Sequence, residues 1–237
     1  MTLLTIVQDA AAEVGIPIPS TVVSNPDSTV VRLLALSNRG GKALAQRFPW
    51  QELVSEWTLT TTATESQGLV ETIMPGFNWD IYQTMWNRNT KFPITGPLFP
   101  AEWQFLKALN ITGPWPQFRI RGDELLCIPV PTAGDTYAGE YVSRYWCQSS
   151  GGTGQERWAA DTDSGVLRED LLTLDLIWRY KKAIGLDYAE EKMEAEMQIN
   201  NAMSRSGSNR ILNLEADAAE RDWPKGISAQ AGNWPLT

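Results

Sequence analysis

Residues 47–62 read RFPWQELVSEWTLTTT, and the periodicity of the chain changes within this stretch. The first part, up to Trp50, ends a helical pattern. In the second part Trp57, Leu59 and Thr61 alternate with polar neighbours, which is the pattern of a β-strand with one buried face. The chain therefore stops building a helical region near residue 50 and starts a β-rich one.

The residues that begin the chain predict an amphipathic helix. Leu4, Val7, Ala11 and Val14 fall at i, i+3, i+7 and i+10, which places them on one apolar stripe. Gly15 ends this pattern, as glycine commonly does just past a helix. A helix with one apolar stripe must pack that stripe on another part of the protein.

A second helix is predicted to begin at NPDST, where Asp27 or Ser28 can cap it, and to continue through VVRLLALSNRGGKALAQRF. Gly40 and Gly41 lie inside this pattern, at a cost of about 1 kcal/mol each relative to alanine. Such a pair marks either a break in the helix or the close approach of another part of the chain. The sequence leaves both alternatives open.

Residues 56–147 carry the signals of strands and turns. Runs that favour strands are separated by glycine- and proline-rich turns, in the order EWTLTTTA, GLVETIM, TMWNRN, QFRIR, ELLCI and TYAGEYVSRYWC. One short helix, AEWQFLKAL, interrupts them. We expect the last three strands to form a meander, with Gly122 and Asp123 turning its first hairpin and residues 129–135 its second.

Helical patterns return after a glycine-rich loop at residues 149–155. In REDLLTLDLIWRYKKAIG, the residues expected to face a core are Leu171, Leu174, Trp178 and Tyr180. In DYAEEKMEAEMQINNAMSRS, the apolar residues that fall in line are Ala189, Met193 and Met197. After residue 207 the periodicity fades.

The order of these patterns predicts an α+β fold. The N- and C-terminal helices can form one lobe only if they pack together, so the β-rich middle is an insertion that leaves this lobe and returns to it. We predict a helical bundle lobe from residues 1–50 and 165–206, an inserted β-rich lobe at 51–164 that is an antiparallel sandwich or barrel-like, and an extended C-terminal arm at 207–237.

The composition excludes some classes of protein. Hydrophobic residues make up 43% of the chain and charged residues 20%, as in folded soluble proteins. The net charge of −8 disfavours a general grip on nucleic-acid phosphates, although an acidic surface would let DNA move past it. No apolar run approaches a membrane span, and the first residues lack the basic region of a signal peptide. We expect no membrane partner and a chain kept in a cytoplasm.

The residues available for chemistry are few. The sequence contains no histidine, which removes the commonest general base and most transition-metal sites. Cys127 and Cys147 are too few for a disulfide framework and are expected to be core or sheet residues. The stretch DTDSG begins like a calcium loop, but Gly165 occupies its third ligand position. Asp161 and Asp163 remain as a hypothetical acid–base pair, whose geometry nothing in the sequence fixes. We expect no enzyme activity, no cofactor and no metal.

Tryptophan is the unusual residue of this chain, with eleven copies. Those in the β-rich middle are more often core residues than contact residues, but an alternative function is a carbohydrate-binding or other tail adhesion module that stacks sugars on Trp57 and Trp86. Trp223 and Trp234 lie in a tail with no core of its own. An arm with such residues usually orders on a partner.

The order of short motifs along the chain resembles that of a known family. These motifs are VGIPIP (14–19), NRGGKALAQRFPWQEL (38–53), EWTLTT (56–61), WNR (86–88), GP (96–97), W-x-x-x-K-A (103–108), FRIRGDELL (118–126), W-x-x-D-x-D (158–163) and LLTLDLIWRYKKAIGLDYAE (171–190). The series, over about residues 1–205, is similar to that of the head-to-tail adaptor (connector) proteins of tailed bacteriophages, which include tail tubular protein A of short-tailed phages. The motifs are structural rather than catalytic.

The resemblance implies a structural virion protein at the head–tail junction, assembled in the host cytoplasm. It implies a ring of twelve copies beneath the portal, with the helices as ring body, the β-rich insertion toward the tail or nozzle proteins, and genomic DNA passing through the lumen without specific contacts. The C-terminal arm would then reach the portal protein, and its expected contact residues are Trp223, Pro224, Trp234 and Pro235. The residues expected to contact the neighbouring subunit are Trp178, Tyr180 and Tyr188.

Overall fold

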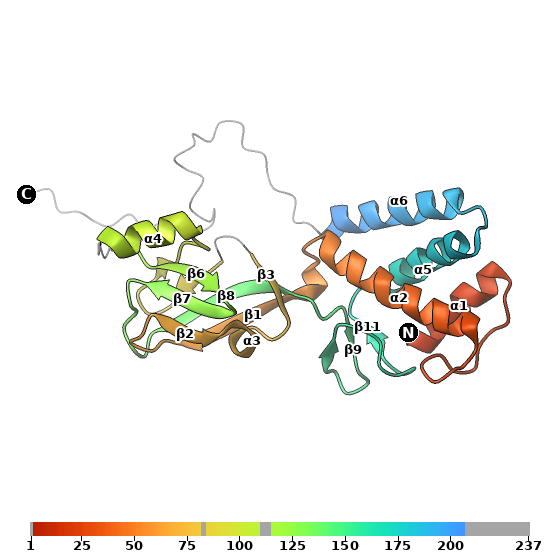
Figure 1. Cartoon of the computed structure of the whole chain (residues 1–237), viewed down its shortest axis with the longest axis horizontal. Helices are drawn as coiled ribbons and strands as arrows, with labels where there is room; N and C mark the ends of the chain where they lie inside the picture. The colour runs from red at the N-terminus through yellow and green to blue at the C-terminus, as the bar shows by residue number, and fades with distance from the viewer. Residues whose placement is uncertain (1, 82–83, 110–114, 207–237) are drawn as a thin grey trace, which may run out of the picture. The chain divides into compact units, whose positions relative to one another are not determined.

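The computed structural model describes residues 2–81, 84–109 and 115–206, which fold as an α+β protein (Figure 1). The α-helices are α1 (Leu3–Val14), α2 (Ser28–Arg47), α3 (Val70–Ile73), α4 (Pro100–Leu109), α5 (Glu169–Ile184) and α6 (Ala189–Ser206), and Gln51–Leu53 forms a 3-10 turn. None of the helices in the described ranges has the length and apolar character needed to cross a membrane. The predicted arm at 207–237 lies outside these ranges.

The strands are short and antiparallel, as the turn signals predict. They are β1 (Val54–Thr60), β2 (Ser66–Leu69), β3 (Phe77–Asp80), β4 (Trp86–Asn87), β5 (Phe92–Pro93), β6 (Gln117–Arg121), β7 (Glu124–Ile128), β8 (Thr136–Ser143), β9 (Cys147–Gln148), β10 (Gly154–Gln155) and β11 (Ser164–Gly165). They form three sheets, ordered β1-β8-β4-β5 with β3 also on β8, β2-β7-β6, and β10-β9-β11.

Both N-terminal helices begin at capping residues. In α1 the side chain of Thr2 accepts a hydrogen bond from the Thr5 amide, and the helix ends at Gly15, whose φ is 77°. In α2 the carboxylate of Asp27 accepts from the Thr29 amide at 2.7 Å. The predicted start of α2 at Asp27 and the predicted stop of α1 at Gly15 are therefore confirmed, whereas the cap at Thr2 was not predicted.

The glycine pair of α2 lies in an unbroken helix. A Cβ atom added to Gly40 would lie 2.2 Å from Oδ2 of Asp175 on α5, and one added to Gly41 would lie 2.3 Å from the ring of Trp146. Of the two alternatives that the sequence left open, close approach is the correct one. Glycine lowers the helix propensity at these two positions, but it allows two side chains from distant parts of the chain to contact the α2 backbone.

The first and last helices share one hydrophobic core. Helices α1 and α2 both contact α5, and α6 packs on α5 (Figure 1). Apolar side chains from each of them are buried in this helical core, among them Leu3, Ile6, Leu33, Leu44, Leu172, Leu176, Ile177 and Ile199. Segments more than 100 residues apart therefore form one body, as the insertion hypothesis requires.

The β-rich insertion has a second core between two sheets. Strand β1 pairs with β8 from Val54↔Val142 to Thr60↔Thr136, while β2, β7 and β6 form the other sheet. Side chains from both sheets are buried together, among them Trp57, Phe118, Leu125, Cys127, Tyr137 and Tyr141. Of the two predicted architectures, this arrangement is the sandwich-like one.

The predicted meander is only half correct. Strands β6 and β7 form a hairpin whose turn residues, Gly122 and Asp123, have φ values of 58° and 62°, as a type I′ turn requires. Strand β8, however, does not pair with β7. It crosses to the other sheet and pairs with β1, and β2 occupies the second edge of β7. Alternation along one strand shows which side chains are buried but not which strand lies beside it.

The third, small sheet packs with the helices rather than with the sandwich. Trp146, Cys147 and Trp158 are buried in the helical core, and the Leu3 amide donates to the Asp163 carbonyl at 2.8 Å. Judged by which core the side chains enter, the insertion therefore ends before Trp146, and the predicted boundary at residue 164 is too far along the chain. Strand-like periodicity cannot show which core a large side chain enters, and these tryptophans fill the space beside the α2 backbone.

We predict that Gly41→Ala destabilises the protein by about 1–3 kcal/mol, because the added methyl group overlaps the Trp146 ring. Helix propensity alone predicts the opposite sign, a gain of about 1 kcal/mol. Urea denaturation followed by tryptophan fluorescence measures the difference. Gly151→Ala is the matched control, since its nearest neighbour would lie at 3.7 Å, and it should change stability little. A stabilised Gly41→Ala protein would contradict the close-approach interpretation.

Candidate functional site

The carboxylates considered for catalysis or calcium have structural partners. Asp161 accepts hydrogen bonds from the amides of Val22 at 3.0 Å and Val23 at 2.8 Å, which ties its loop to the connection between α1 and α2. Asp163 is buried and accepts from the amides of Ala159 and Ala160 at 2.7 and 2.8 Å. Each side chain therefore replaces water as the partner of backbone amides. Among the described residues, no group of three or more potential metal ligands is assembled.

The two thiols are buried and unpaired with each other, as the sequence predicts for core residues. Burial raises the pKa of Cys127 to about 12 and that of Cys147 to about 12, because a thiolate in an apolar core loses its hydration. A thiol in this state is a poor nucleophile at neutral pH. Neither cysteine is a candidate for covalent catalysis.

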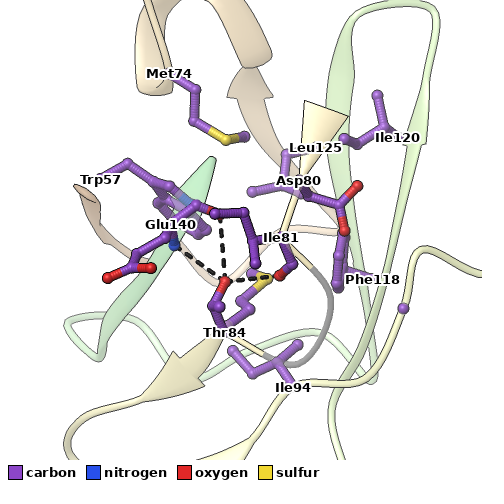
Figure 2. Close-up of a pocket in the computed structure, with 12 residues that line it drawn as sticks. Trp57, Met74, Asp80, Ile81, Thr84, Ile94, Phe118, Ile120, Leu125 and Glu140 are labelled. Atoms are coloured by element: carbon purple, nitrogen blue, oxygen red, sulfur yellow. Dashed lines mark hydrogen bonds between the residues drawn. The ribbon is translucent and has the colours of Figure 1, made fainter. Parts of the chain in front are cut away.

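A cavity lies in the sandwich near β3 and β8, but it is small (Figure 2). Its volume is about 20 Å³, which is room for a single water molecule. Thr84 forms part of its wall. The Thr84 hydroxyl accepts a hydrogen bond from the Glu140 amide at 3.1 Å and donates one to the Ile81 carbonyl at 2.8 Å. Asp80 also lines it, and burial raises the pKa of this carboxyl. The cavity is a packing defect rather than a ligand site.

Most tryptophans of the β-rich middle are buried. Those with exposed fractions of 6% or less are Trp57, Trp103, Trp146 and Trp158. Trp57 was one of two residues assigned to a sugar-stacking platform, and a buried ring cannot stack on a sugar. Trp79 and Trp86 are half-buried, so of the proposed sugar-stacking pair only Trp86 keeps some exposed area. Trp115 is 47% exposed and packs edge-to-face on Phe92 at 5.1 Å between ring centroids.

An aromatic cluster with three cations lies on α5 and α6. The Trp178 and Tyr188 rings are 6.4 Å apart, and the Arg179 guanidinium lies 4.6 Å from the Trp178 centroid. The ammonium groups of Lys182 and Lys192 each lie 6.0 Å from the same ring. We call these five residues the aromatic cluster. Such rings supply rigid, half-exposed contact area of the kind found at protein interfaces.

Asp175 holds the aromatic cluster in place. This buried carboxylate accepts from Nε1 of Trp178 at 3.0 Å and from Nε of Arg179 at 2.5 Å, directly against Gly40. Sequence reasoning missed Asp175, although a carboxylate three and four residues before a tryptophan and an arginine is a local signal. Tyr180, by contrast, is 5% exposed and faces the helical core. It is therefore unsuited to the predicted subunit contact, because helix geometry turns it away from Trp178.

The outer face of α6 carries an apolar stripe that the monomer does not cover. The helix packs on the core through Ala195, Ile199 and Ala202, whereas Met193 and Met197 are 74% and 56% exposed. The sequence pattern places these methionines in line with Ala189 on one stripe, and in the structure this stripe faces away from the helical core. Their stripe is real but lies on the opposite face, because two apolar stripes share this helix and only one meets α5.

No protein-family model matches the chain, and no curated protein sequence matches it. The order of the motifs and the surfaces described above are therefore what supports a functional assignment.

Asp161→Ala should lower the free energy of unfolding by about 1–3 kcal/mol, because it leaves the buried amide of Val22 without a partner. Thermal and urea denaturation measure this loss. Millimolar calcium should not change the stability of the unmodified chain. The exposed Asp9→Ala serves as control and should stay within about 0.5 kcal/mol. Stabilisation by calcium that disappears in Asp161→Ala would restore the calcium-loop interpretation.

The thiols should be protected from alkylation at pH 8 and react only after unfolding, which mass spectrometry of iodoacetamide-treated protein measures. In an unfolded chain they ionise near their ordinary pKa of 9.0, but in the folded chain only near 12. The folded state therefore retains protons that the unfolded state loses, so stability falls as the pH rises from 9 toward 12. Rapid labelling of either native thiol at pH 8 would contradict its burial.

Proposed function

We propose that this chain is a structural virion protein: a ring of twelve copies that joins the capsid portal to the tail and surrounds the path of the genome. Two lines support this proposal. The order of sequence motifs is similar to that of the head-to-tail adaptors, and the chain has the helical body with a β-rich insertion that this resemblance implies. In addition, the two carboxylates considered for catalysis, Asp161 and Asp163, accept hydrogen bonds from backbone amides, and both thiols are buried.

The observation that carries the proposal is the uncovered apolar surface of the helical body. Met193 and Met197 are largely exposed on α6, and the aromatic cluster lies on the same helix pair. Methionine, tryptophan and tyrosine are enriched at protein–protein interfaces, whereas lysine is more frequent on surfaces that stay in contact with water. A ring buries such a surface in every subunit.

The insertion offers a separate surface for tail or nozzle proteins. Exposed aromatic side chains lie in and next to α4, and this helix packs on the insertion through the buried side chain of Trp103. Their exposed fractions are 73% for Phe99 and 62% for Phe105. Exposed rings of this size on a folded domain mark an interaction site more often than a solvated surface. We assign this end of the sandwich to the tail side of the junction.

The arm at residues 207–237 supplies the portal contact in this proposal. Its residues lie outside the described structure, and the sequence places Trp223, Pro224, Trp234 and Pro235 in it. Tryptophan side chains that enter pockets on a partner commonly contribute 2 kcal/mol or more, about 30-fold in affinity, to binding.

We predict that Trp223→Ala and Trp234→Ala each weaken binding to the purified portal ring at least tenfold, measured by biolayer interferometry on the full chain. Trp115→Ala is the matched control, because Trp115 is exposed on the insertion and should leave portal affinity unchanged. Equal affinities for all four proteins would remove the arm from the portal interface.

A further inference from the structure

The exposed face of α2 is cationic in an acidic protein. Its charged residues are Arg32, Arg39, Lys42 and Arg47, and the helix contains no Asp or Glu, although the chain carries a net charge of −8. Arg47 is paired with Glu196. The other three are exposed and form no ion pair with any residue in the described ranges.

These three cations share the outer face of the helix. Arg39 and Lys42 follow Arg32 at i+7 and i+10, which is two and nearly three turns along one side. Ala35 and Ala43, also exposed, lie on the same side of the helix and add no bulk. The opposite side of α2 is the one that enters the helical core. The result is a positively charged ridge that has no ion-pair partner among residues 2–81, 84–109 and 115–206.

The exposed stripe of α6 has the complementary character. Met193 and Met197 form its apolar centre, and Glu190 and Glu194 flank them. Both of these glutamates are exposed and form no ion pair within the part of the chain that the structure describes. The other two acids of the helix are already paired, Glu191 with Lys181 and Glu196 with Arg47. The stripe also borders a shallow hollow on α6, which is lined by Lys192, Met193, Glu196, Met197, Asn200 and Asn201.

One copy of the chain cannot bring these two faces together. Helices α2 and α6 both pack on α5 and bury the sides that face the helical core, so the cationic ridge and the Met–Glu stripe both point outward. A second copy can satisfy both faces at once. A contact between two different faces of identical subunits is heterologous, and repeated contacts of this kind close into a ring when the rotation allows it.

We infer that the α2 ridge of one subunit docks on the α6 Met–Glu stripe of the next. This inference rests on the proposed ring and names the surfaces that build it. The apolar centre supplies buried area, the alanines permit close approach, and the charges fix orientation and exclude ridge-to-ridge or stripe-to-stripe contacts. Nucleic acid is a less suitable occupant of the ridge, because it would leave the methionines of the stripe uncovered.

Charge reversal tests this pairing in the full chain with the purified portal ring. One variant carries Arg39→Glu and Lys42→Glu, and the other carries Glu190→Lys and Glu194→Lys. Sedimentation velocity measures how many copies join the portal. For each variant alone, the number of copies that join the portal should fall at least tenfold, because charges of the same sign then face each other at every subunit contact. All four positions are exposed, and circular dichroism should show unchanged folding.

A mixture of the two variants in equal amounts should assemble again. The reversed ridge of one variant then meets the reversed stripe of the other, and the remaining ridge and stripe keep their natural charges, so an alternating ring has complementary charges at every contact. A chain with all four substitutions should also assemble alone. Arg121→Glu, at the end of β6 in the insertion, is the matched control for the change in charge and should assemble normally.

The outcomes separate this inference from the proposed function. If both variants assemble as well as the unmodified chain, or if the mixture fails as each variant fails, the pairing is overturned while the ring stands. If the ridge variant assembles but loses affinity for duplex DNA, the ridge belongs to nucleic acid and the pairing is overturned. If the unmodified chain itself adds no copies to the portal, the proposed function falls, and the pairing falls with it.

Discussion

The close approach that Gly40 and Gly41 permit is the constraint on which the rest of the fold depends. At Gly40 the α2 backbone meets Asp175 from the C-terminal helices, and at Gly41 it meets Trp146 from the end of the insertion. Three segments that are distant in the sequence therefore converge within one turn of a single helix. Any side chain larger than hydrogen at these two positions would push at least one segment away.

Two tryptophans next to the glycine pair connect the insertion to the helical body through packing and hydrogen bonds. Trp146 and Trp158 pack edge-to-face with ring centroids 4.9 Å apart, and the Trp158 indole donates to the Ser37 hydroxyl of α2 at 2.9 Å. The Trp146 indole donates to the Glu156 carbonyl at 2.7 Å. Since β1 follows α2 directly and pairs with β8, which ends just before Trp146, the insertion is held where it leaves the helices and where it returns.

Local chemistry predicted much of the fold. The cap at Asp27, the glycine stop at Gly15 and the turn at Gly122 each depend on neighbours along the chain, so the sequence contains the information. The partner of β8, the core that Trp158 enters and the meaning of the glycine pair depend on residues far away in the sequence. No pattern within a short window contains them.

For the candidate surfaces too, the sequence predicted local features but not those that depend on distant residues. Periodicity identified the stripe of Met193 and Met197 but did not show that it faces outward, because a second stripe of α6 is the one that packs on α5. It grouped Tyr180 with Trp178, although the two lie on different sides of α5. The absence of histidine, by contrast, needed no structure: it disfavoured catalysis, whereas the order of the motifs and the aromatic arm indicated assembly.

The central claim is that this chain assembles as a ring on a portal. Native mass spectrometry of the full chain, alone and mixed with its phage's portal ring, tests it most directly, since it counts copies without assuming which surface binds. The proposal predicts a complex in which twelve copies add to one portal ring, even if the free chain is a monomer. A chain that remains monomeric and leaves the mass of the portal unchanged would contradict it.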